Sequence, residues 1–535
     1  MGENNRNFLI PIYISVALSV GVLIGDFMSR GLGKNKLQNL KNANKLYEVL
    51  NILDQNYVDD INKDSLFLST INDMLHKLDP HSNYIPSDEV LRMRESIEGK
   101  FGGIGVRFFI LRDTICITNV IENTPASNAG LMSGDKITHV NSELVAGVSI
   151  SNEDVMKRLK GQENTEVSLT VSRNKKKLDF KFNRGSIPLQ TVNSSYMFDD
   201  STGYIRIDQF SIPTYDEFMV SAKVLLDSKM KRLVLDLRNN GGGVMESAVK
   251  IVDEFLPEGQ LIVSARGKNF KSQNIYSTGN ALLKNIPLVI LMNAYSASAS
   301  EIVAGALQDN DRGVIVGNTS FGKGLIQEDR KMSDGSRLRV TVARYYTPSG
   351  RCIQRPYEGK SYEDYILERR SQKTSGKESS NNTFPDSLKF ETIYKKRPVY
   401  GGGGIYPDVI IELDTMPDSL QFSAFFLNAR LIGAFTAFSF DFLQKNHEKW
   451  NNFDEFKSDP TIINFNCDLF YSYCLDQYGL PFIERETAFN RETIKTWVKA
   501  ELARQIWGDR GYFKIINQDD PFITKGLSSF GFLER

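Results

Sequence analysis

Two short segments of the chain carry a serine and a lysine of types that can perform nucleophilic catalysis together. Residues 293–302 read NAYSASASEI and contain Ser298, and residues 320–327 read SFGKGLIQ and contain Lys323. No histidine lies near either segment. A serine hydroxyl attacks a carbonyl group when a base takes its proton, and lysine is one recognised base for this purpose. The two segments therefore predict a hydrolase that uses a serine–lysine pair.

Ser298 lies at the junction of two expected elements. The apolar run Leu288–Met292 is typical of a buried strand, and Ala299–Leu307 is expected to be a helix. The Ala299 amide would then point out of a helix N-terminus, where it can stabilise an oxyanion. Taken alone, the segment also fits a plain helix start in which the serine only caps the helix.

Lys323 lies between Gly322 and Gly324, so its backbone can approach other elements closely. A lysine base must be neutral, and with a reference pKa of about 10.4 the neutral form costs roughly 4–5 kcal/mol at pH 7. Burial can lower the pKa that far. Gln327 is four residues further on, and on a strand or a helix it would share a face with Lys323 and could orient its amine. The alternative is a solvated surface lysine.

Two glycine-rich stretches offer backbone amides. Residues 236–244 read DLRNNGGGV after an expected strand at 232–237, and such a turn can form a nest for an anion or oxyanion. A phosphate loop is disfavoured because the Gly-Lys-Ser/Thr ending is missing. Residues 101–106 read FGGIGV, and the amides of such a loop can bind the terminal carboxylate of a peptide that adds as a strand.

The elements around these segments predict an α/β core. Strands are expected at 204–207, 313–316 and 409–413, with a helix at 215–226. Residues 99–187 have short apolar runs separated by glycine turns and one helix at 152–159, which is typical of a small β-rich module. Helices are also expected at 37–54 and 65–78. The polar stretch 358–396 is interpreted as a flexible insertion. Beyond residue 417 the pattern is helical, clearest at 490–508, with Asn490 as a candidate N-cap and Gly508 as a stop.

These patterns divide the chain into five parts. They are a membrane anchor or signal segment (1–30), a helical region (31–98), the β-rich module (99–187), the α/β core with its insertion (188–416) and a helical domain (417–535). The uncharged run 8–25 is long enough to cross a bilayer. We favour an uncleaved anchor over a cleaved signal peptide, because no small-x-small site follows. The basic residues after the run conflict with an exported orientation.

Composition narrows the classes of partner and compartment. The chain has 65 basic and 65 acidic residues, which gives no support for a nucleic-acid partner. Its four cysteines are too few for a disulfide scaffold, and their spacing does not predict a zinc site. We interpret them as core or incidental thiols.

Several motifs together resemble the carboxy-terminal processing proteases, also called tail-specific proteases. Within residues 37–413 they are LDPHSNYI (78–85), FGGIGV (101–106), TPASNAGLMSGDKITHVN (124–141), GYIRIDQFS (203–211), DLRNNGGG (236–243), SASASEIVAGALQDN (296–310), GNTSFGKGLIQ (317–327), YYTPSGRCIQ (345–354) and GIYPDV (404–409). The resemblance implies a crotonase/ClpP-like α/β protease core with an inserted PDZ domain at 99–187. The N-terminal transmembrane helix is predicted from the apolar run 8–25 and not from the resemblance. The insertion at 358–396 and the C-terminal α-helical domain after residue 417 depart from the simplest pattern of the family.

The resemblance also implies roles for individual residues. Ser298 takes the place of the nucleophile, Lys323 of the general base and Gln327 of its positioning partner. The oxyanion hole is the Ala299 amide with one from Gly242 or Gly243. The PDZ residues that bind a peptide tail are Phe101, Gly102, Gly103, Ile104, Gly105 and Val106.

The implied activity is an endopeptidase that recognises apolar C-termini of proteins, needs no metal or cofactor and works outside the cytoplasm. A homo-oligomer or an activating partner is left open. One competing hypothesis is a PDZ scaffold whose protease core has decayed, and another is an acyl-CoA enzyme of the crotonase type. His81 could replace Lys323 as the base, although we interpret it as structural, near a turn.

Overall fold

The computed structural model describes residues 34–375, 385–411, 422–446 and 450–534. The chain divides into two compact units, residues 1–74 and 75–535, and each is described by itself. Helix α2 (Lys34–Asn56) lies in the first unit, and α3 (Lys63–His76) begins there. Both confirm the helices expected near these positions. The expected membrane anchor lies outside the described residues.

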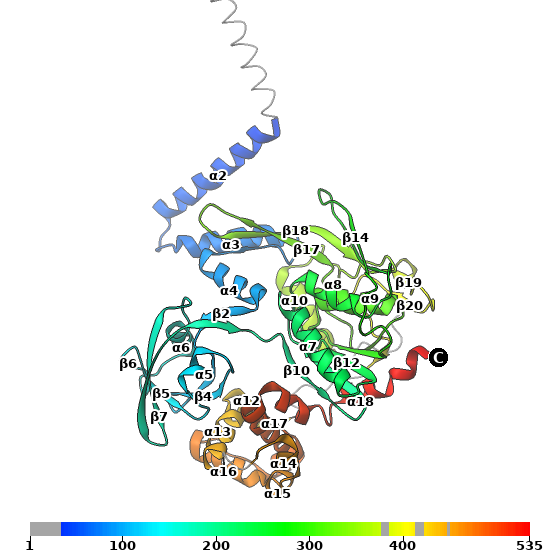
Figure 1. Ribbon diagram of the computed structural model, residues 1–535. Helices are drawn as coiled ribbons and strands as arrows, with labels where there is room; N and C mark the ends of the chain where they lie inside the picture. Colours follow the sequence, from blue (N-terminus) through cyan, green and yellow to red (C-terminus); the bar gives the residue numbers. More distant parts are fainter. Residues whose placement is uncertain (1–33, 376–384, 412–421, 447–449, 535) are drawn as a thin grey trace, which may run out of the picture. The chain divides into compact units, whose positions relative to one another are not determined.

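The core of the second unit is a six-stranded sheet with the order β10-β11-β12-β15-β16-β21. Figure 1 labels two of its strands, β10 and β12. Strand β10 is antiparallel to β11, and the other pairs are parallel. This arrangement confirms the α/β core and the strands expected within it. The strands are β10 (Val192–Met197), β11 (Thr202–Ile207), β12 (Arg232–Asp236), β15 (Leu288–Met292), β16 (Val314–Gly317) and β21 (Val409–Ile410).

Both faces of this sheet are buried, so its strands are apolar on both sides. Ile205, Leu235 and Ile290 join the cluster formed with helices α7 (Thr214–Asp227), α8 (Met245–Asp253) and α9 (Ala299–Asp309). Their alternating neighbours, such as Val234 and Leu291, join a second cluster with Phe522 and Ile523 of α18 (Pro521–Ser528). A helix near the end of the chain therefore contributes to the core of the six-stranded sheet.

The second unit contains another sheet, which has five strands. Its order is β1-β18-β13-β14, and β17 also pairs with β18. Strand β1 comes from the LDPHSNYI motif and is antiparallel to β18. The strands are β1 (Asn83–Ile85), β13 (Leu261–Arg266), β14 (Gln273–Tyr276), β17 (Leu325–Lys331) and β18 (Arg337–Tyr346).

The β-rich module forms its own sheet, with the order β3-β4-β5-β7-β8 and β6 paired with β5. Its helix α6 (Asn152–Leu159) has the bounds expected from the sequence. The remaining elements are α4 (Ser87–Glu98), β2 (Lys100–Gly103), β3 (Val106–Leu111), β4 (Thr114–Val120), α5 (Pro125–Ala129), β5 (Lys136–Val140), β6 (Glu143–Leu144), β7 (Glu166–Arg173), β8 (Lys176–Asn183) and β9 (Gly185–Pro188). Strand β2 pairs with β9, and β3 is an edge strand that pairs with β4.

The interpretation of residues 358–396 as a flexible loop is wrong for the part that the structure describes. This part contains α10 (Tyr362–Ser375), a short 3-10 turn (Asp386–Leu388) and β19 (Lys389–Glu391), which pairs with β20 (Pro398–Tyr400). Tyr365 is buried, and the Arg355 guanidinium lies 3.9 Å from the centre of its ring. A few anchoring residues therefore order a stretch whose composition is mostly polar.

The last part of the chain is helical, as expected, and packs around an aromatic core that includes Phe426, Phe456 and Phe470. Its helices are α12 (Ala424–Leu431), α13 (Ala434–Asn446), α14 (Phe453–Ser458), α15 (Pro460–Ile463), α16 (Cys467–Tyr478), α17 (Glu484–Ile516), α18 and a 3-10 turn (Phe530–Glu534). None of the described helices is alone long and apolar enough to cross a membrane, whereas α12 and α13, bent by 70°, pass that test as a pair.

One of two expectations about α17 is corrected, and the other is confirmed. The helix begins at Glu484, so Asn490 lies inside it and is not its N-cap; its side chain accepts a hydrogen bond from the Ser423 amide. A first helical stretch stops at Trp507 and Gly508 (φ +66°), as expected, and a second stretch follows as far as Ile516. Glycine allows this break because it adopts positive φ at little cost. The four cysteines are free thiols, and three of them, Cys116, Cys467 and Cys474, are buried, in agreement with their interpretation as core or incidental thiols.

Candidate active site

Ser298 lies where the chain passes from β15 to α9, and it is more exposed than the serines on either side of it. Ser296 and Ser300 are fully buried, whereas Ser298 is half-buried. Its backbone adopts φ +55°, which is uncommon for a residue other than glycine. Such outliers cluster at functional sites. Ser298 is therefore the serine of this segment that a substrate can reach.

The two buried serines join the Ser298 loop to the glycine turn, by which we mean residues 239–243 after β12. Ser300 Oγ donates to the Asn240 carbonyl at 3.0 Å. Ser296 Oγ donates to the Leu237 carbonyl at 2.8 Å, just before the turn. The Ala297 amide also donates to the Asn240 carbonyl, at 2.9 Å. The three bonds hold the glycine turn against the start of α9.

Gly242 lies directly against Ser298. A Cβ atom at Gly242 would be 2.7 Å from Ser298 Cβ and 2.9 Å from the Ala299 nitrogen, and φ there is +98°. The Gly242 amide donates to Asn240 Oδ1 at 2.9 Å. Among the described residues, the Gly243 amide has no hydrogen-bond partner. Ala299 is the first residue of α9, so its amide has no acceptor within the helix. The predicted oxyanion donors are thus brought beside the predicted nucleophile.

Glu301 is a site residue that the sequence reasoning missed. Its carboxylate is fully buried, and Oε2 accepts from the amides of Ser298 (2.8 Å) and Lys323 (2.9 Å). Oε1 accepts from the Gly322 amide (2.7 Å) and the Ser320 hydroxyl. Burial raises the pKa of Glu301, and these four hydrogen bonds oppose the rise. The Ser-x-x-Glu spacing of a capping box was a sequence signal for the bond between the Ser298 amide and Glu301. It gave no signal for the bonds between Glu301 and the lysine loop.

Tyr345, from β18, joins the same two loops from the carbonyl side. Its buried hydroxyl lies 2.7 Å from the Lys323 carbonyl oxygen and 3.2 Å from the Ser298 carbonyl oxygen. A hydroxyl has one proton, so the two oxygens share it. Together, Glu301 and Tyr345 hold the backbones of Ser298 and Lys323 at a fixed separation.

Lys323 has the altered basicity that its predicted role requires. Its pKa is lowered from 10.5 to about 8, mainly by burial and also by the positive charge of Arg339, while the negative charges of Glu301 and Asp79 act in the opposite direction. A substantial share of this amine is therefore neutral near pH 8. Among the described residues, no hydrogen bond joins Lys323 Nζ to Ser298 Oγ.

Gln327 is close to the lysine loop in sequence but contacts another residue. Its amide nitrogen lies 3.3 Å from Thr341 Oγ1, and a β-bulge at Ile326 and Gln327 interrupts the regular alternation of side chains along β17. Within the described residues, no hydrogen bond joins its amide to Lys323. Its role as positioning partner stays a prediction.

The LDPHSNYI motif lies beside the lysine, with His81 in a turn as expected. Asp79 accepts from the Ser82 hydroxyl at 2.6 Å, and Ser82 Oγ accepts from the Thr341 amide at 3.1 Å. The pKa of His81 is lowered to about 3, mainly by burial and also by the positive charges of Lys323 and Arg355, while Asp79 opposes the decrease. His81 is therefore neutral at physiological pH and packs edge-on against the rings of Phe321 and Tyr365.

The predicted tail-binding residues form a strand, a tight connection and the start of an edge strand. Phe101, Gly102 and Gly103 belong to β2, and Val106 begins β3. Gly105 has φ +89°, and a Cβ atom there would lie 2.3 Å from Thr124. An edge strand presents unpaired backbone groups to which an extended peptide can add.

Comparisons with known proteins decide the family. Residues 201–359 match the family described as Peptidase family S41, and residues 102–183 match the PDZ domain. A "Carboxy-terminal-processing protease" of Bartonella bacilliformis is 34% identical over 358 residues, which cover 65% of this chain and 79% of that protein. The chain belongs to peptidase family S41. A "Probable CtpA-like serine protease" of Staphylococcus aureus (strain MRSA252) is 35% identical over 327 residues, 60% of this chain and 64% of that protein.

Solved structures of similar proteins include a "Photosystem II D1 C-terminal processing protease". It is 23% identical, with a TM-score of 0.35, over 70% of this chain and 94% of that one. A PDZ domain of a carboxy-terminal protease from Vibrio cholerae, solved with a peptide, is 26% identical over 17% of this chain and 99% of that one, with a TM-score of 0.16. By its family-model matches this S41 peptidase has a PDZ domain, and its fold adds a C-terminal helical region. The likeness of its core to crotonase and ClpP stays a prediction.

Proposed function

We propose that this S41 peptidase is a serine endopeptidase that processes the C-termini of proteins through an acyl-enzyme, with Ser298 as nucleophile and Lys323 as base. The observation that carries the proposal is the shared carboxylate oxygen of Glu301, which fixes the backbones of both residues. The lowered pKa of Lys323 and the accessible position of Ser298 support the same roles.

In the acylation step, neutral Lys323 Nζ takes the proton of Ser298 Oγ while Oγ attacks the carbonyl carbon of the scissile peptide bond. The carbonyl oxygen becomes an oxyanion, which the amides of Ala299 and Gly243 or Gly242 stabilise. The C–N bond then breaks, and the ammonium of Lys323 returns its proton to the leaving amine. The product is an ester on Ser298 and a free C-terminal fragment.

In the deacylation step, Lys323 is neutral again and takes a proton from water while the water oxygen attacks the ester carbonyl. The tetrahedral intermediate collapses, the proton returns to Ser298 Oγ, and the shortened substrate leaves with a new carboxylate. The side chains of Ser298 and Lys323 must approach closely for both steps. Catalytic hydrogen bonds are often long in the absence of substrate and tighten in the complex.

The PDZ domain is the proposed recognition site for the apolar C-terminus of the substrate. The tail would add beside the edge strand β3, with its carboxylate at the amides of residues 101–106. Binding there raises the local concentration of the same substrate at the catalytic serine. We place the enzyme outside the cytoplasm, held by its N-terminal apolar run, and protease accessibility of the intact protein in whole cells would test this location.

The deciding experiment uses a folded reporter protein that ends in an apolar tail, incubated with wild type, Ser298→Ala and Lys323→Ala. We expect cleavage by wild type alone, and mass spectrometry should show a shortened C-terminus. The same reporter with a tail ending in aspartates is the control for specificity. If no form cleaves the reporter but all of them bind it, the protein is a scaffold or requires activation by a partner. Cleavage by Lys323→Ala at the wild-type rate would exclude Lys323 as the base.

A further inference from the structure

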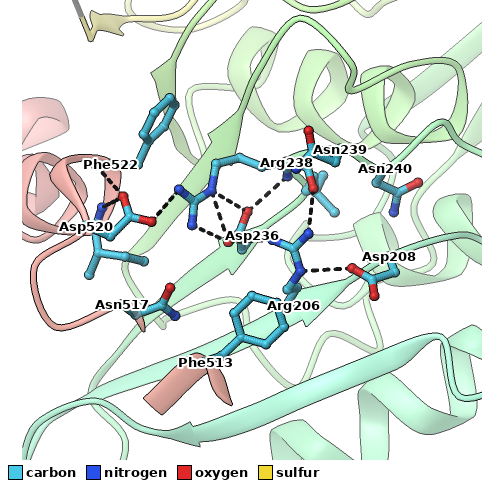
Figure 2. Close-up of polar contacts among 12 residues, drawn as sticks. Arg206, Asp208, Asp236, Arg238, Asn239, Asn240, Phe513, Asn517, Asp520 and Phe522 are labelled. Carbon is cyan, nitrogen blue, oxygen red and sulfur yellow. Dashed lines mark hydrogen bonds and ion pairs between the residues drawn. The ribbon is translucent and has the colours of Figure 1, made fainter. Parts of the chain in front are cut away.

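The C-terminal helical region is bonded directly to the residue that precedes the glycine turn. Arg238 Nη2 donates to Asp236 Oδ2 at 2.7 Å, and Arg238 Nη1 donates to Asp520 Oδ2 at 2.6 Å. Figure 2 shows the guanidinium between these two carboxylates. The Arg238 side chain is 11% exposed and Asp236 is fully buried. Arg238 therefore depends on both carboxylates for its polar contacts.

Asp520 is the N-cap of α18 as well as a partner of Arg238. Its Oδ1 accepts from the Phe522 amide at 2.7 Å, while Oδ2 faces the guanidinium. The Phe522 ring centre lies 4.9 Å from the Arg238 guanidinium, and the same ring joins the core of the protease sheet. A charge at Asp520 is thus held in place by the helix that it caps and by the sheet on which that helix packs.

A second arginine makes the Asp520 charge necessary. Arg206 Nη1 donates to Asp236 Oδ2 at 3.1 Å, and Arg206 Nη2 donates to the Arg238 carbonyl at 3.0 Å. Two guanidinium groups therefore share one buried carboxylate. Asp208 partners Arg206, and Asp520 partners Arg238 (Figure 2). Without Asp520, Arg238 would compete with Arg206 for Asp236, since a buried charge needs its own partner.

The same part of the chain also contacts the PDZ domain. Asp509, just after the break at Gly508, pairs with Arg107 of β3 at 2.7 Å. Further along, the Phe513 carbonyl accepts from the Tyr196 hydroxyl at 3.1 Å, and the Asn517 amide nitrogen donates to that hydroxyl at 2.9 Å. Residues 509–522, called the C-terminal segment below, thus link the predicted tail-binding strand to the base of the glycine turn.

We infer that the C-terminal segment positions the glycine turn for catalysis, with Asp520 as the positioning residue, and that its Asp509–Arg107 contact couples this turn to the PDZ strand β3. Arg238 is followed by Asn239 and Asn240, whose backbones bond to Asn293 and Ala297 beside the nucleophile. A displacement of Arg238 is therefore passed to the amides of Gly242 and Gly243. The inference rests on the proposed protease function, but one of its measurements does not require activity.

The first test replaces Asp520 by serine in the full chain. Serine still caps a helix, but it is too short and uncharged to pair with Arg238. We expect kcat to fall about 10-fold or more, because misplaced oxyanion donors cost up to roughly 10³-fold, while KM changes little. The kcat of Asp520→Asn should lie between the kcat of wild type and that of Asp520→Ser, because an amide oxygen can still accept a hydrogen bond from Arg238. Asp519→Ser, which removes an exposed carboxylate one residue away, should behave as wild type.

Hydrogen–deuterium exchange provides the readout that is independent of activity. In Asp520→Ser, the peptide that covers residues 237–244 should exchange faster, while α9 exchanges as in wild type. Faster exchange throughout the chain together with a lower Tm would show a merely structural role and overturn the inference. An unchanged kcat in an active enzyme would also overturn it. Absence of cleavage by wild type would instead refute the proposed function.

The second test is a double-mutant cycle on Arg107 and Asp509. If the contact couples strand β3 to the turn, Arg107→Gln and Asp509→Asn should each lower kcat by a similar factor, and the double variant should lose no more than either. If the two single-variant factors in kcat multiply in the double variant, the coupling is excluded. An unchanged kcat in all three variants would exclude it as well. Glu166→Gln, which removes an exposed ion pair with Lys181 on the same domain, is the control.

Discussion

Ser298 and Lys323 donate their backbone amides to one and the same oxygen atom, Oε2 of Glu301, at 2.8 and 2.9 Å. The spacing of the two loops is therefore set by their backbones. Their side chains remain available for substrate, and no hydrogen bond between Ser298 Oγ and Lys323 Nζ is present among the described residues. The other carboxylate oxygen of Glu301 binds Gly322 and Ser320 of the lysine loop.

Replacement of Glu301 by glutamine should disrupt this arrangement. A glutamine has one acceptor oxygen, and its NH₂ group would face backbone N–H donors. Each buried donor left without a partner costs about 1–3 kcal/mol, and a displacement of about 1 Å between catalytic groups can cost about 10²-fold in rate. We expect a fall of that size in kcat and a lower midpoint of urea unfolding. Glu328→Gln is the control, because this side chain of β17 is 42% exposed and pairs only at the surface, with Arg330. A wild-type kcat in Glu301→Gln would show that the carboxylate is dispensable.

The three serines of the SASAS motif should differ in their effects. Ser298→Ala should lower kcat by about 10⁴-fold or more, as expected for a nucleophile. Ser296→Ala and Ser300→Ala each remove one buried hydrogen bond to a carbonyl group and should destabilise the protein by about 1–2 kcal/mol while most activity remains. Steady-state kinetics and urea unfolding of the three variants decide this. An equal loss of activity in all three would sink the assignment of Ser298.

The pH dependence of cleavage should report the titration of Lys323. With a pKa of about 8, only about one-tenth of the amine is neutral at pH 7. We therefore expect kcat/KM of wild type to rise tenfold per pH unit below about pH 8 and to level off above it. A tail without titrating groups near pH 8 is needed as substrate. A profile that is already flat at pH 7 would show that the base is another group.

Lys323 should also destabilise the fold at neutral pH. Its pKa is lowered from 10.5 to about 8 in the folded protein, so the unfolded chain binds this proton more tightly. The resulting decrease in the free energy of unfolding is fully present below pH 8, and it disappears as the pH rises from 8 towards 10.5. Lys323→Met should thus be inactive but more stable at pH 7, by up to about 3 kcal/mol, with a smaller gain at pH 10. Urea unfolding at both pH values measures the difference; a gain that is larger at pH 10 would contradict it.

Two adjacent glycines provide a matched test of the glycine turn. At Gly242 a methyl group would lie 2.7 Å from Ser298 Cβ and from the Ala297 carbonyl oxygen, at a φ of +98°. At Gly241 a Cβ atom would have no atom within 4 Å. We expect Gly242→Ala to lose at least about 10²-fold in kcat, as when an oxyanion donor is removed, and Gly241→Ala to stay near wild type. Both should bind an apolar peptide through the PDZ domain with unchanged Kd, as measured by fluorescence anisotropy.

Local patterns were sufficient for the elements that surround the site. Strand β15 and helix α6 have the bounds expected from the sequence, because the continuous apolar run of β15 and the local pattern of α6 depend only on neighbouring residues. The same reasoning failed at residues 358–396, where the polar composition concealed the buried anchor Tyr365. It also failed at Asn490, since a residue suited to a cap can equally lie inside a helix and bind another segment.

Residue types and spacing were enough to nominate the groups of the proposed site, because a serine before a helix, a lysine between glycines and a glycine turn are recognisable in the chain itself. How these groups are held followed from the folded structure alone. Glu301 joins the loops of Ser298 and Lys323, and Asp520 reaches Arg238 from a distant part of the chain. Local sequence carries no signal for such contacts, because a buried carboxylate takes whichever donors the folded chain brings to it, and those donors come from segments far apart in sequence.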